Sequence, residues 1–217
     1  MSLKECRVRC RGEWDSYDCE VNFLDAPVLN NEFVRLEPLG EAHHSDLVEA
    51  VRVGDLWKAW YTHIPSPEVM LATIHKRRAA HAEGSVVPWA VIEASSGRAV
   101  GMTTYLNIEP TNRRLEIGST WLGVNAQGTG INAAAKLLLL SRAFDDLGCG
   151  AVEFRAHWHN RQSRAAIEKL GAKQDGVLRN HTVFENGTVR DTVVYSIIDG
   201  EWPTVKYGLQ HRLAALR

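Results

Sequence analysis

The sequence predicts an α/β domain whose central sheet is twisted and mostly antiparallel, contains one parallel β-α-β crossover and carries helices on both faces. Two pairs of alternating runs are each joined by a short turn, which favours antiparallel hairpins. Between them, a strand-like run, a helical run and a second strand-like run follow one another around a Gly-Thr-Gly turn, the order of a parallel crossover. At 217 residues, the chain suits one good-sized domain rather than two.

The first half of the chain predicts a strand, two helices and a hairpin. "FVRLEPL" alternates apolar and polar residues as a half-buried strand does. An apolar stripe indicates the first helix, and Ser66 can cap the second. The expected elements are a strand at 33–39, helices at about 41–53 and 66–81, and paired strands at 89–94 and 99–106.

The second half predicts the crossover and a second hairpin. The run at 129–147 is helical and Gly148 ends it, whereas Asn186-Gly187 is a strong turn signal between two alternating runs. The expected elements are a strand at 113–123, a helix at 129–147, a strand at 151–158, a helix at 160–170, two strands around Asn186-Gly187 and a short helix near the C-terminus.

Charge and composition narrow the functional classes. The net charge is -1, whereas nonspecific nucleic-acid or membrane-surface binding needs a concentrated positive field. We therefore expect neither nucleic acid nor membrane among the partners. No window approaches about 18 consecutive apolar residues, and the N-terminus lacks the basic-then-apolar pattern of a secretory signal. A cytoplasmic location is the expectation.

Residues 1–25 are charged and unpatterned, so they predict an irregular leader before a domain at 26–217. Cys6, Cys10 and Cys19 lie in this leader, and Cys149 follows a predicted helix. A zinc site would need a fourth ligand near the leader cysteines, and no histidine lies close to them in the sequence. Free thiols and no bound metal are therefore expected.

The turn at Gly128-Thr129-Gly130 has several interpretations. Glycine allows a positive φ, and a helix that begins there points free N–H groups at an anion, so the turn suits a phosphate. A Walker loop is excluded because Gly130 is followed by Ile131 rather than lysine. The Gly-x-Gly-x-x-Ala dinucleotide pattern fits, but the next strand ends in Arg155-Ala156-His157 and not in the acidic residue that would hold the ribose. A capping turn without any ligand is a third alternative.

The segment "NAQGTGINAAAKLLLLSRAFDDLGCGAVEFRAHWHNRQSRAAIEKLGAKQDGVLRN" resembles the acetyl-CoA signature of the GNAT superfamily of N-acetyltransferases. Within it, the resemblance is to the branch of ribosomal-protein N-terminal acetyltransferases (RimJ/RimL-type). In this superfamily the pattern Gln/Arg-x-x-Gly-x-Gly/Ala binds the CoA pyrophosphate through backbone amides. Asn125 stands here where Gln or Arg is usual. The resemblance extends from about Val28 to Trp202.

The resemblance implies acetyl-CoA as the cosubstrate and a set of residues that bind it. Asn160 and Ser163 match the positions that face the pantetheine arm, although Asn160 is also a good helix cap, and both roles are compatible. The implied CoA-binding residues are Leu122, Val124, Gln127, Gly128, Thr129, Gly130, Ile131, Asn132, Asn160 and Ser163.

Acetyl transfer needs an unprotonated amine, and Glu116 is the expected general base. Many members of the superfamily carry a Glu on the equivalent strand, and the two-residue strand period turns Glu116 away from Leu115 and Ile117. The equivalent of the family's acid tyrosine is Ile167, which has no proton to give. Ser163 is the remaining candidate to hydrogen-bond the departing sulfur, with solvent as the alternative donor. A simple solvated strand position is the other interpretation of Glu116.

The acceptor is expected to be an amine on a protein N-terminus or a small molecule. Trp57, Trp60, Tyr61 and His63 lie between the first two helices, where they either line the acceptor cleft or pack in the core. A homodimer is compatible with the branch. Two other functional classes stay open, a sensor of the same fold that binds acyl-CoA without turnover and an NAD(P)-dependent oxidoreductase.

Overall fold

The computed structural model describes residues 22–184 and 186–216. The predicted free thiols at Cys6, Cys10 and Cys19, and most of the predicted leader, lie outside these residues. The described part begins close to the core, because Phe23 is fully buried among the apolar side chains.

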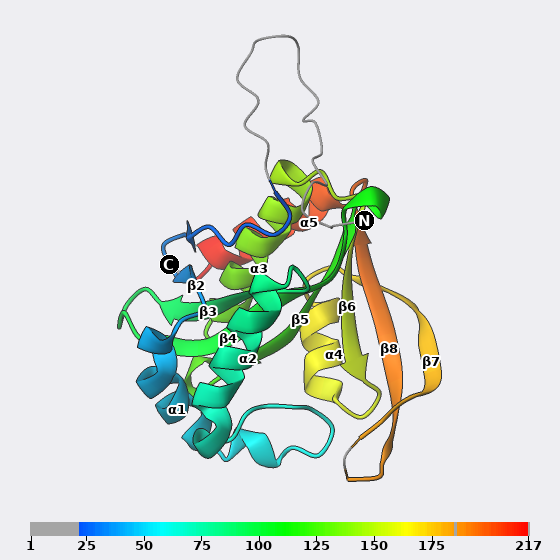
Figure 1. Cartoon of the computed structure of the whole chain (residues 1–217). Helices are drawn as coiled ribbons and strands as arrows, with labels where there is room; N and C mark the ends of the chain where they lie inside the picture. Colours follow the sequence, from blue (N-terminus) through cyan, green and yellow to red (C-terminus); the bar gives the residue numbers. More distant parts are fainter. Residues whose placement is uncertain (1–21, 185, 217) are drawn as a thin grey trace.

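The described strands form one mixed sheet of eight strands in the order β1-β2-β3-β4-β5-β6-β8-β7. Every neighbouring pair is antiparallel except β5 and β6, which are parallel. The predicted fold class is confirmed (Figure 1). The strands are β1 (Leu29–Asn30), β2 (Val34–Pro38), β3 (Val87–Glu93), β4 (Ala99–Glu109), β5 (Arg114–Leu122), β6 (Ala151–His157), β7 (Lys173–Val183) and β8 (Val189–Ile198).

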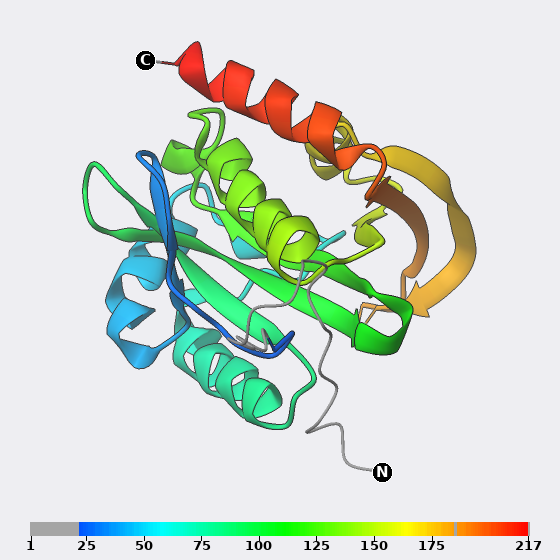
Figure 2. The same cartoon turned by 90° about the horizontal axis from the view of Figure 1, so that it is seen from above.

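Helices cover both faces of the sheet, as predicted (Figure 2). One core lies between the sheet and α3, α4 and α5, and a second lies between the sheet and α1 and α2. Strand β3 is therefore buried along most of its length, with Trp89 and Val91 in the first core and Ala90 and Ile92 in the second. The helices are α1 (His44–Arg52), α2 (Met70–Ala82), α3 (Ile131–Ser141), α4 (Arg161–Glu168) and α5 (Trp202–Ala214).

The structure corrects several details of the predicted elements. The single helix expected at 129–147 is α3 followed by a π-helical turn at Arg142–Asp146. Ser66 makes no side-chain capping bond, because a 3-10 turn at Pro67–Val69 precedes α2. The terminal helix α5 is as long as α2, at 13 residues. Strand β1 was not predicted, since two residues are too few for a periodic pattern.

The parallel strands β5 and β6 separate after a short contact. They pair only through Arg114–Glu116 against 151–153. Just beyond, the register between β4 and β5 shifts, and Ser119 adopts a left-handed conformation with φ of 46°. A bulge bends the strand that contains it. The remaining part of β5 therefore leaves β6 and opens a split in the sheet, which the glycine turn follows.

Candidate active site

The glycine turn lies at the open side of the split and has the geometry of an anion site. Gly128 and Gly130 have φ of 78° and 93°. Within the described chain, no acceptor contacts the backbone N–H groups of residues 128–132, and α3 has no side-chain cap. A Cβ at Gly128 would meet no atom within 4 Å, so the space before Gly128 is open, whereas the side chain of Leu216 lies against Gly130. Free amides at a helix N-terminus favour a phosphate.

Side-chain hydrogen bonds connect α4 to this turn. Gln162 Nε2 donates to Gln127 Oε1 (2.9 Å), and Gln127 Nε2 donates to the carbonyl of Leu122 (2.9 Å). Asn160 Oδ1 accepts from the backbone N–H of Ser163 at 3.0 Å, so Asn160 caps α4 as one interpretation expected. The structure therefore brings the predicted residues on β5, the turn and α4 together.

Two other predicted contacts surround the same opening. Val124 follows β5 and is 40% exposed. Thr129 does not point its hydroxyl at an anion, because Thr129 Oγ1 bonds the carbonyl of Ala126 at 2.9 Å. The contribution of Thr129 to an anion site is thus its backbone amide.

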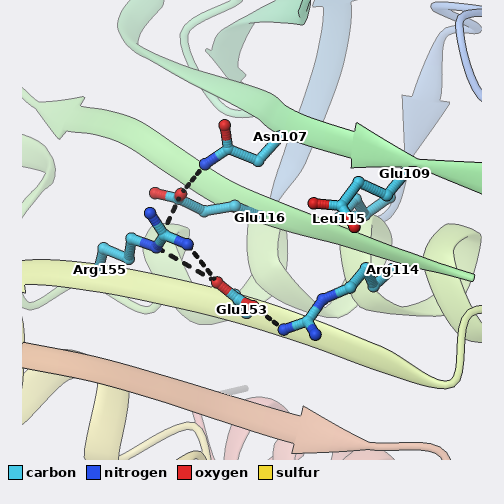
Figure 3. Close-up of a pocket in the computed structure, with 7 residues that line it drawn as sticks. All are labelled: Asn107, Glu109, Arg114, Leu115, Glu116, Glu153 and Arg155. Atoms are coloured by element: carbon cyan, nitrogen blue, oxygen red, sulfur yellow. Dashed lines mark hydrogen bonds and ion pairs between the residues drawn. The ribbon is translucent and has the colours of Figure 1, made fainter. Parts of the chain in front are cut away.

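Glu116 lies at the vertex of the split. Leu115 and Ile117 point into the core beneath α3, and Glu116 points to the opposite face, as the strand period predicted. Its carboxylate is buried, and Oε2 accepts from Asn107 Nδ2 at 2.7 Å (Figure 3). Burial raises the pKa of Glu116, while Arg155, Asn107 and Arg190 oppose that rise. A buried carboxylate with a raised pKa is suited to accept a proton near neutral pH.

A charged network extends from Glu116 along β6 (Figure 3). Arg155 lies between two carboxylates, with Nη2 2.9 Å from Glu153 Oε2 and Nε 3.5 Å from Glu116 Oε2. Arg114 pairs with the other oxygen of Glu153. These groups line a cavity of about 160 Å³ that also includes Asn107. These contacts hold the Glu116 carboxylate in place. Among the described residues, no ion pair brings a lysine or arginine nitrogen closer than 3.5 Å to its oxygens.

The sequence analysis did not single out Asn107, Glu153 or Arg155. The alternation in 151–158 places residues 153, 155 and 157 on one strand face, and this signal could have found Glu153 and Arg155. Asn107 belongs to β4, and its contact with Glu116 depends on the pairing of β4 with β5. No local pattern in the sequence indicates that contact.

The aromatic residues between α1 and α2 separate into two groups. Trp57 packs against the core beneath α1 and α2. Trp60 instead contacts the end of β6, with its ring 5.3 Å from His157 and 5.5 Å from His159. His63 contacts Phe184 of the β7–β8 turn at 4.8 Å. The α1–α2 loop therefore borders the face that carries Glu116.

Two further reactive or charged residues, Cys149 and Arg35, lie outside this site. Cys149 is buried, and burial raises the pKa of its thiol to about 12, so it is a poor nucleophile. Arg35 pairs with Glu37 on the exposed side of β2. The described residues contain no cluster of three or more side chains suited to a metal. Among them, no helix is long and apolar enough to cross a bilayer.

Known proteins share this fold and sequence pattern. A family model described as "Acetyltransferase (GNAT) domain" matches residues 34–173. "Putative ribosomal N-acetyltransferase YdaF" of Bacillus subtilis (strain 168) is 35% identical over 106 residues, which are 49% of this chain and 57% of that protein. A GCN5-related N-acetyltransferase from Brucella melitensis superposes with a TM-score of 0.80 at 29% identity, covering 86% of this chain and 85% of that one.

A third similarity concerns the fold alone. Mycobacterium smegmatis RimJ, solved in complex with CoA-disulfide, has a TM-score of 0.70 at 20% identity and covers 82% of this chain and 88% of that one. The mixed sheet, opened between its two parallel strands, is the GNAT class of fold. The chain belongs to the acetyltransferase (GNAT) family, since the family model covers more than half of it. The family prediction is confirmed, and the match spans a little over half the length of YdaF.

Proposed function

We propose that the protein transfers an acetyl group from acetyl-CoA to an amine, with Glu116 as the general base. One observation carries the proposal. A buried carboxylate with a raised pKa lies at the vertex of a split whose open side ends in free helix-terminal amides. Strand β5 contains Glu116 and leads to the free amides, so one elongated cosubstrate that lies along this strand can contact both.

The residues at the open side fit the CoA pyrophosphate. The amides of residues 128–132 have no acceptor in the described chain, and the space before Gly128 is open. Asn160 keeps its amide nitrogen for the pantetheine arm, because only its oxygen caps α4. The Mycobacterium smegmatis RimJ structure contains CoA-disulfide, which supports the same ligand class. Acetyl-CoA supplies the acetyl group and takes up one proton on its sulfur after transfer.

Glu116 removes the proton that blocks the amine. Free amines are largely protonated at neutral pH, with a pKa of about 8 for an α-amino group. One proton of the ammonium group passes to the carboxylate, directly or through water. The free amine nitrogen then bonds the acetyl carbon as the carbon–sulfur bond breaks, and the nitrogen loses a second proton while the CoA sulfur gains one. Asn107 and Arg155 orient the carboxylate. Ser163 is proposed to hydrogen-bond the departing sulfur, since its hydroxyl makes no hydrogen bond within the described residues.

A Glu116→Gln variant tests the base. The expected result is a fall in kcat of about 100- to 10,000-fold, because general-base catalysis contributes on that order. CoA affinity, measured by calorimetry, should stay unchanged. Glu109→Gln is the matched control, since Glu109 lines the same cavity but bonds Asn112 instead of the base network. Wild-type turnover by Glu116→Gln across pH would exclude this role, and CoA binding without turnover of any amine by the wild type would indicate a sensor.

A further inference from the structure

The face that carries Glu116 holds a buried arginine nitrogen without a partner. Arg190 belongs to β8, and within the described chain its guanidinium makes no hydrogen bond and no ion pair, while its Nε is completely buried. Arg190 lies close enough to Glu116 and Arg155 for both charges to act on its pKa, which burial lowers most. An unpaired buried donor costs free energy unless a ligand satisfies it.

His157 provides a second unpaired donor on the same face. Its side chain lies at the end of β6 and is only 3% exposed. Nδ1 accepts from the backbone N–H of His159 at 3.0 Å, so the neutral ring carries its proton on Nε2. Nε2 is buried and has no partner in the described residues. Burial and the Arg190 charge lower the pKa of His157, which keeps the ring neutral at pH 7.

The other charged groups on this face already have partners. Arg155 lies between Glu116 and Glu153, and Arg114 pairs with Glu153. Asp191, next to Arg190 in the sequence, accepts from Arg179 Nε at 2.6 Å and from the backbone N–H of Asn180. Glu109, which lines the same cavity, bonds Asn112. Arg190, unlike Arg155 and Arg114, therefore has no ion pair within the described residues. An anionic group on the acceptor is therefore complementary to Arg190.

We propose that Arg190 and the Nε2–H of His157 bind a carboxylate on the amine acceptor. The inference rests on the acetyl-transfer function and specifies its substrate class as an amine that also carries a carboxylate. A guanidinium and an imidazole N–H are complementary to carboxylate oxygens, and charge-assisted hydrogen bonds of this kind are the strong ones. Binding the carboxylate at this end of β6 directs the amine along the strand face toward Glu116.

The α1–α2 loop and the β7–β8 turn give this site an apolar border. The rings of Trp60 and Phe184 lie 5.3 and 5.7 Å from the His157 ring. These rings exclude water from the imidazole, and water exclusion strengthens a hydrogen bond to it. Trp60 is itself 49% exposed, so the border is open to a molecule that arrives from solvent. The carboxylate can come from a free amino acid or from an acidic side chain near a peptide N-terminus.

Matched acceptors test the carboxylate directly in the wild-type protein. Free amino acids are compared with their amides, with spermidine, and with tripeptide amides that differ only by Asp or Asn at the second position. CoA release should show a kcat/KM about 10- to 100-fold higher for a carboxylate acceptor than for its neutral match, which corresponds to a hydrogen bond with a charged group. Preference within the amino-acid pairs or within the peptide pairs identifies the source. Equal rates within every pair, or a preference for spermidine, would overturn the proposal.

Variants connect that preference to the two side chains. Arg190→Gln and His157→Phe should each raise the KM of the carboxylate acceptor about tenfold or more and abolish the preference, with the KM of acetyl-CoA unchanged. Arg190→Lys should restore part of it. Arg35→Gln is the control, because Arg35 is an exposed arginine that pairs with Glu37 on β2, outside this site. A uniform loss of kcat with every acceptor would indicate a structural role and contradict the proposal.

A binding measurement separates this inference from the acetyl-transfer function. Calorimetry of the same acceptors with the CoA-bound protein requires no turnover. Tighter binding of the carboxylate member of a pair, lost in Arg190→Gln, would support the site even if no acceptor is acetylated, in which case only the proposed function fails. Equal affinity of both members would contradict the site.

Discussion

The environment of Glu116 is made by residues on two other strands and by a glycine on its own. Asn107 on β4 and Arg155 on β6 contact the carboxylate, while Gly118 lies two residues along β5 on the same face. Burial raises the pKa of Glu116, while Arg155 and Asn107 oppose that rise. The base is therefore sensitive to small changes around it.

Gly118 leaves the space that the Glu116 carboxylate occupies. A Cβ at this position would lie 2.7 Å from Glu116 Oε1 and 2.8 Å from Leu106 Cδ1. We expect Gly118→Ala to lower kcat about 10- to 100-fold, because a displacement of about 1 Å at a catalytic group costs that much. The KM of acetyl-CoA should change little.

Steady-state kinetics with both substrates varied would measure this effect. Gly176→Ala is the matched control, since Gly176 is also a strand glycine and its added Cβ would meet no atom within 4 Å. A Gly118→Ala protein with the wild-type kcat would show that the carboxylate position is not critical.

At the scale of elements, the order of strands and helices was predictable, and their long-range adjustments were not. The alternating runs of the two hairpins and the glycine turn are local signals, and each corresponds to an element in the structure. The π-helical turn after α3 lies where Tyr105 Oη donates to the carbonyl of Leu139 at 2.5 Å. That contact joins residues that are 34 positions apart in the sequence, so the helical periodicity of the sequence does not predict it.

The candidate site likewise contains parts that local sequence signals predict and parts that depend on long-range contacts. The glycine turn and the Asn160 cap are encoded within a few residues, so the sequence alone indicated both. Arg190 faces Glu116 only because β8 lies beside β6, with β7 at the sheet edge. Strand order of this kind is a property of the folded chain, and the hairpin pattern did not predict which of the two strands would be inside.

The glycine turn makes a prediction about α3 as an element. Gly128→Ala adds a methyl group to the open space before the free amides and forces an L residue to a φ of 78°. We expect the KM of acetyl-CoA to rise about tenfold or more with a smaller change in kcat, because the backbone can no longer approach a pyrophosphate closely.

Backbone strain is the competing explanation for that result, and Gly148 controls for it. Gly148 follows the π-helical turn, has φ of 63° and also faces open space. Gly148→Ala should cost a similar free energy of unfolding, about 1 kcal/mol, with no effect on the KM of acetyl-CoA. Equal KM changes in both variants would remove the turn from the proposed binding site.

At the scale of the whole molecule, the two faces of the sheet have different roles. Helices α1 and α2 pack against β3, β4 and β5, whereas α3, α4 and α5 fill the opposite face. The Glu116 face of β6 and β8 is bordered by the α1–α2 loop, so an acceptor can reach it. The split lies between β5 and β6. Helix α3 contacts the sheet beside the split through a buried lysine.

Lys136 of α3 should lower the free energy of unfolding of the whole domain at pH values below 10. It is 4% exposed, and its Nζ donates to Thr103 Oγ1 on β4 (3.0 Å) and Thr120 Oγ1 on β5 (2.7 Å). No carboxylate of the described residues is among its partners, and burial lowers the pKa of Lys136 from 10.5 to about 7. The unfolded chain therefore holds this proton more tightly than the folded protein does.

Linkage gives the sign of the effect. Between about pH 7 and 10.5 the unfolded state binds more protons, so Lys136 makes the free energy of unfolding rise with pH, by at most about 1.4 kcal/mol per unit. Lys136→Met removes this dependence. The variant should be more stable than wild type at pH 6.5, and its advantage should shrink by a few kcal/mol by pH 9.5. Urea unfolding of both proteins at several pH values measures the difference, and exposed Lys76→Met serves as the control. A difference that stays constant across this range would mean that Lys136 keeps an ordinary pKa when folded.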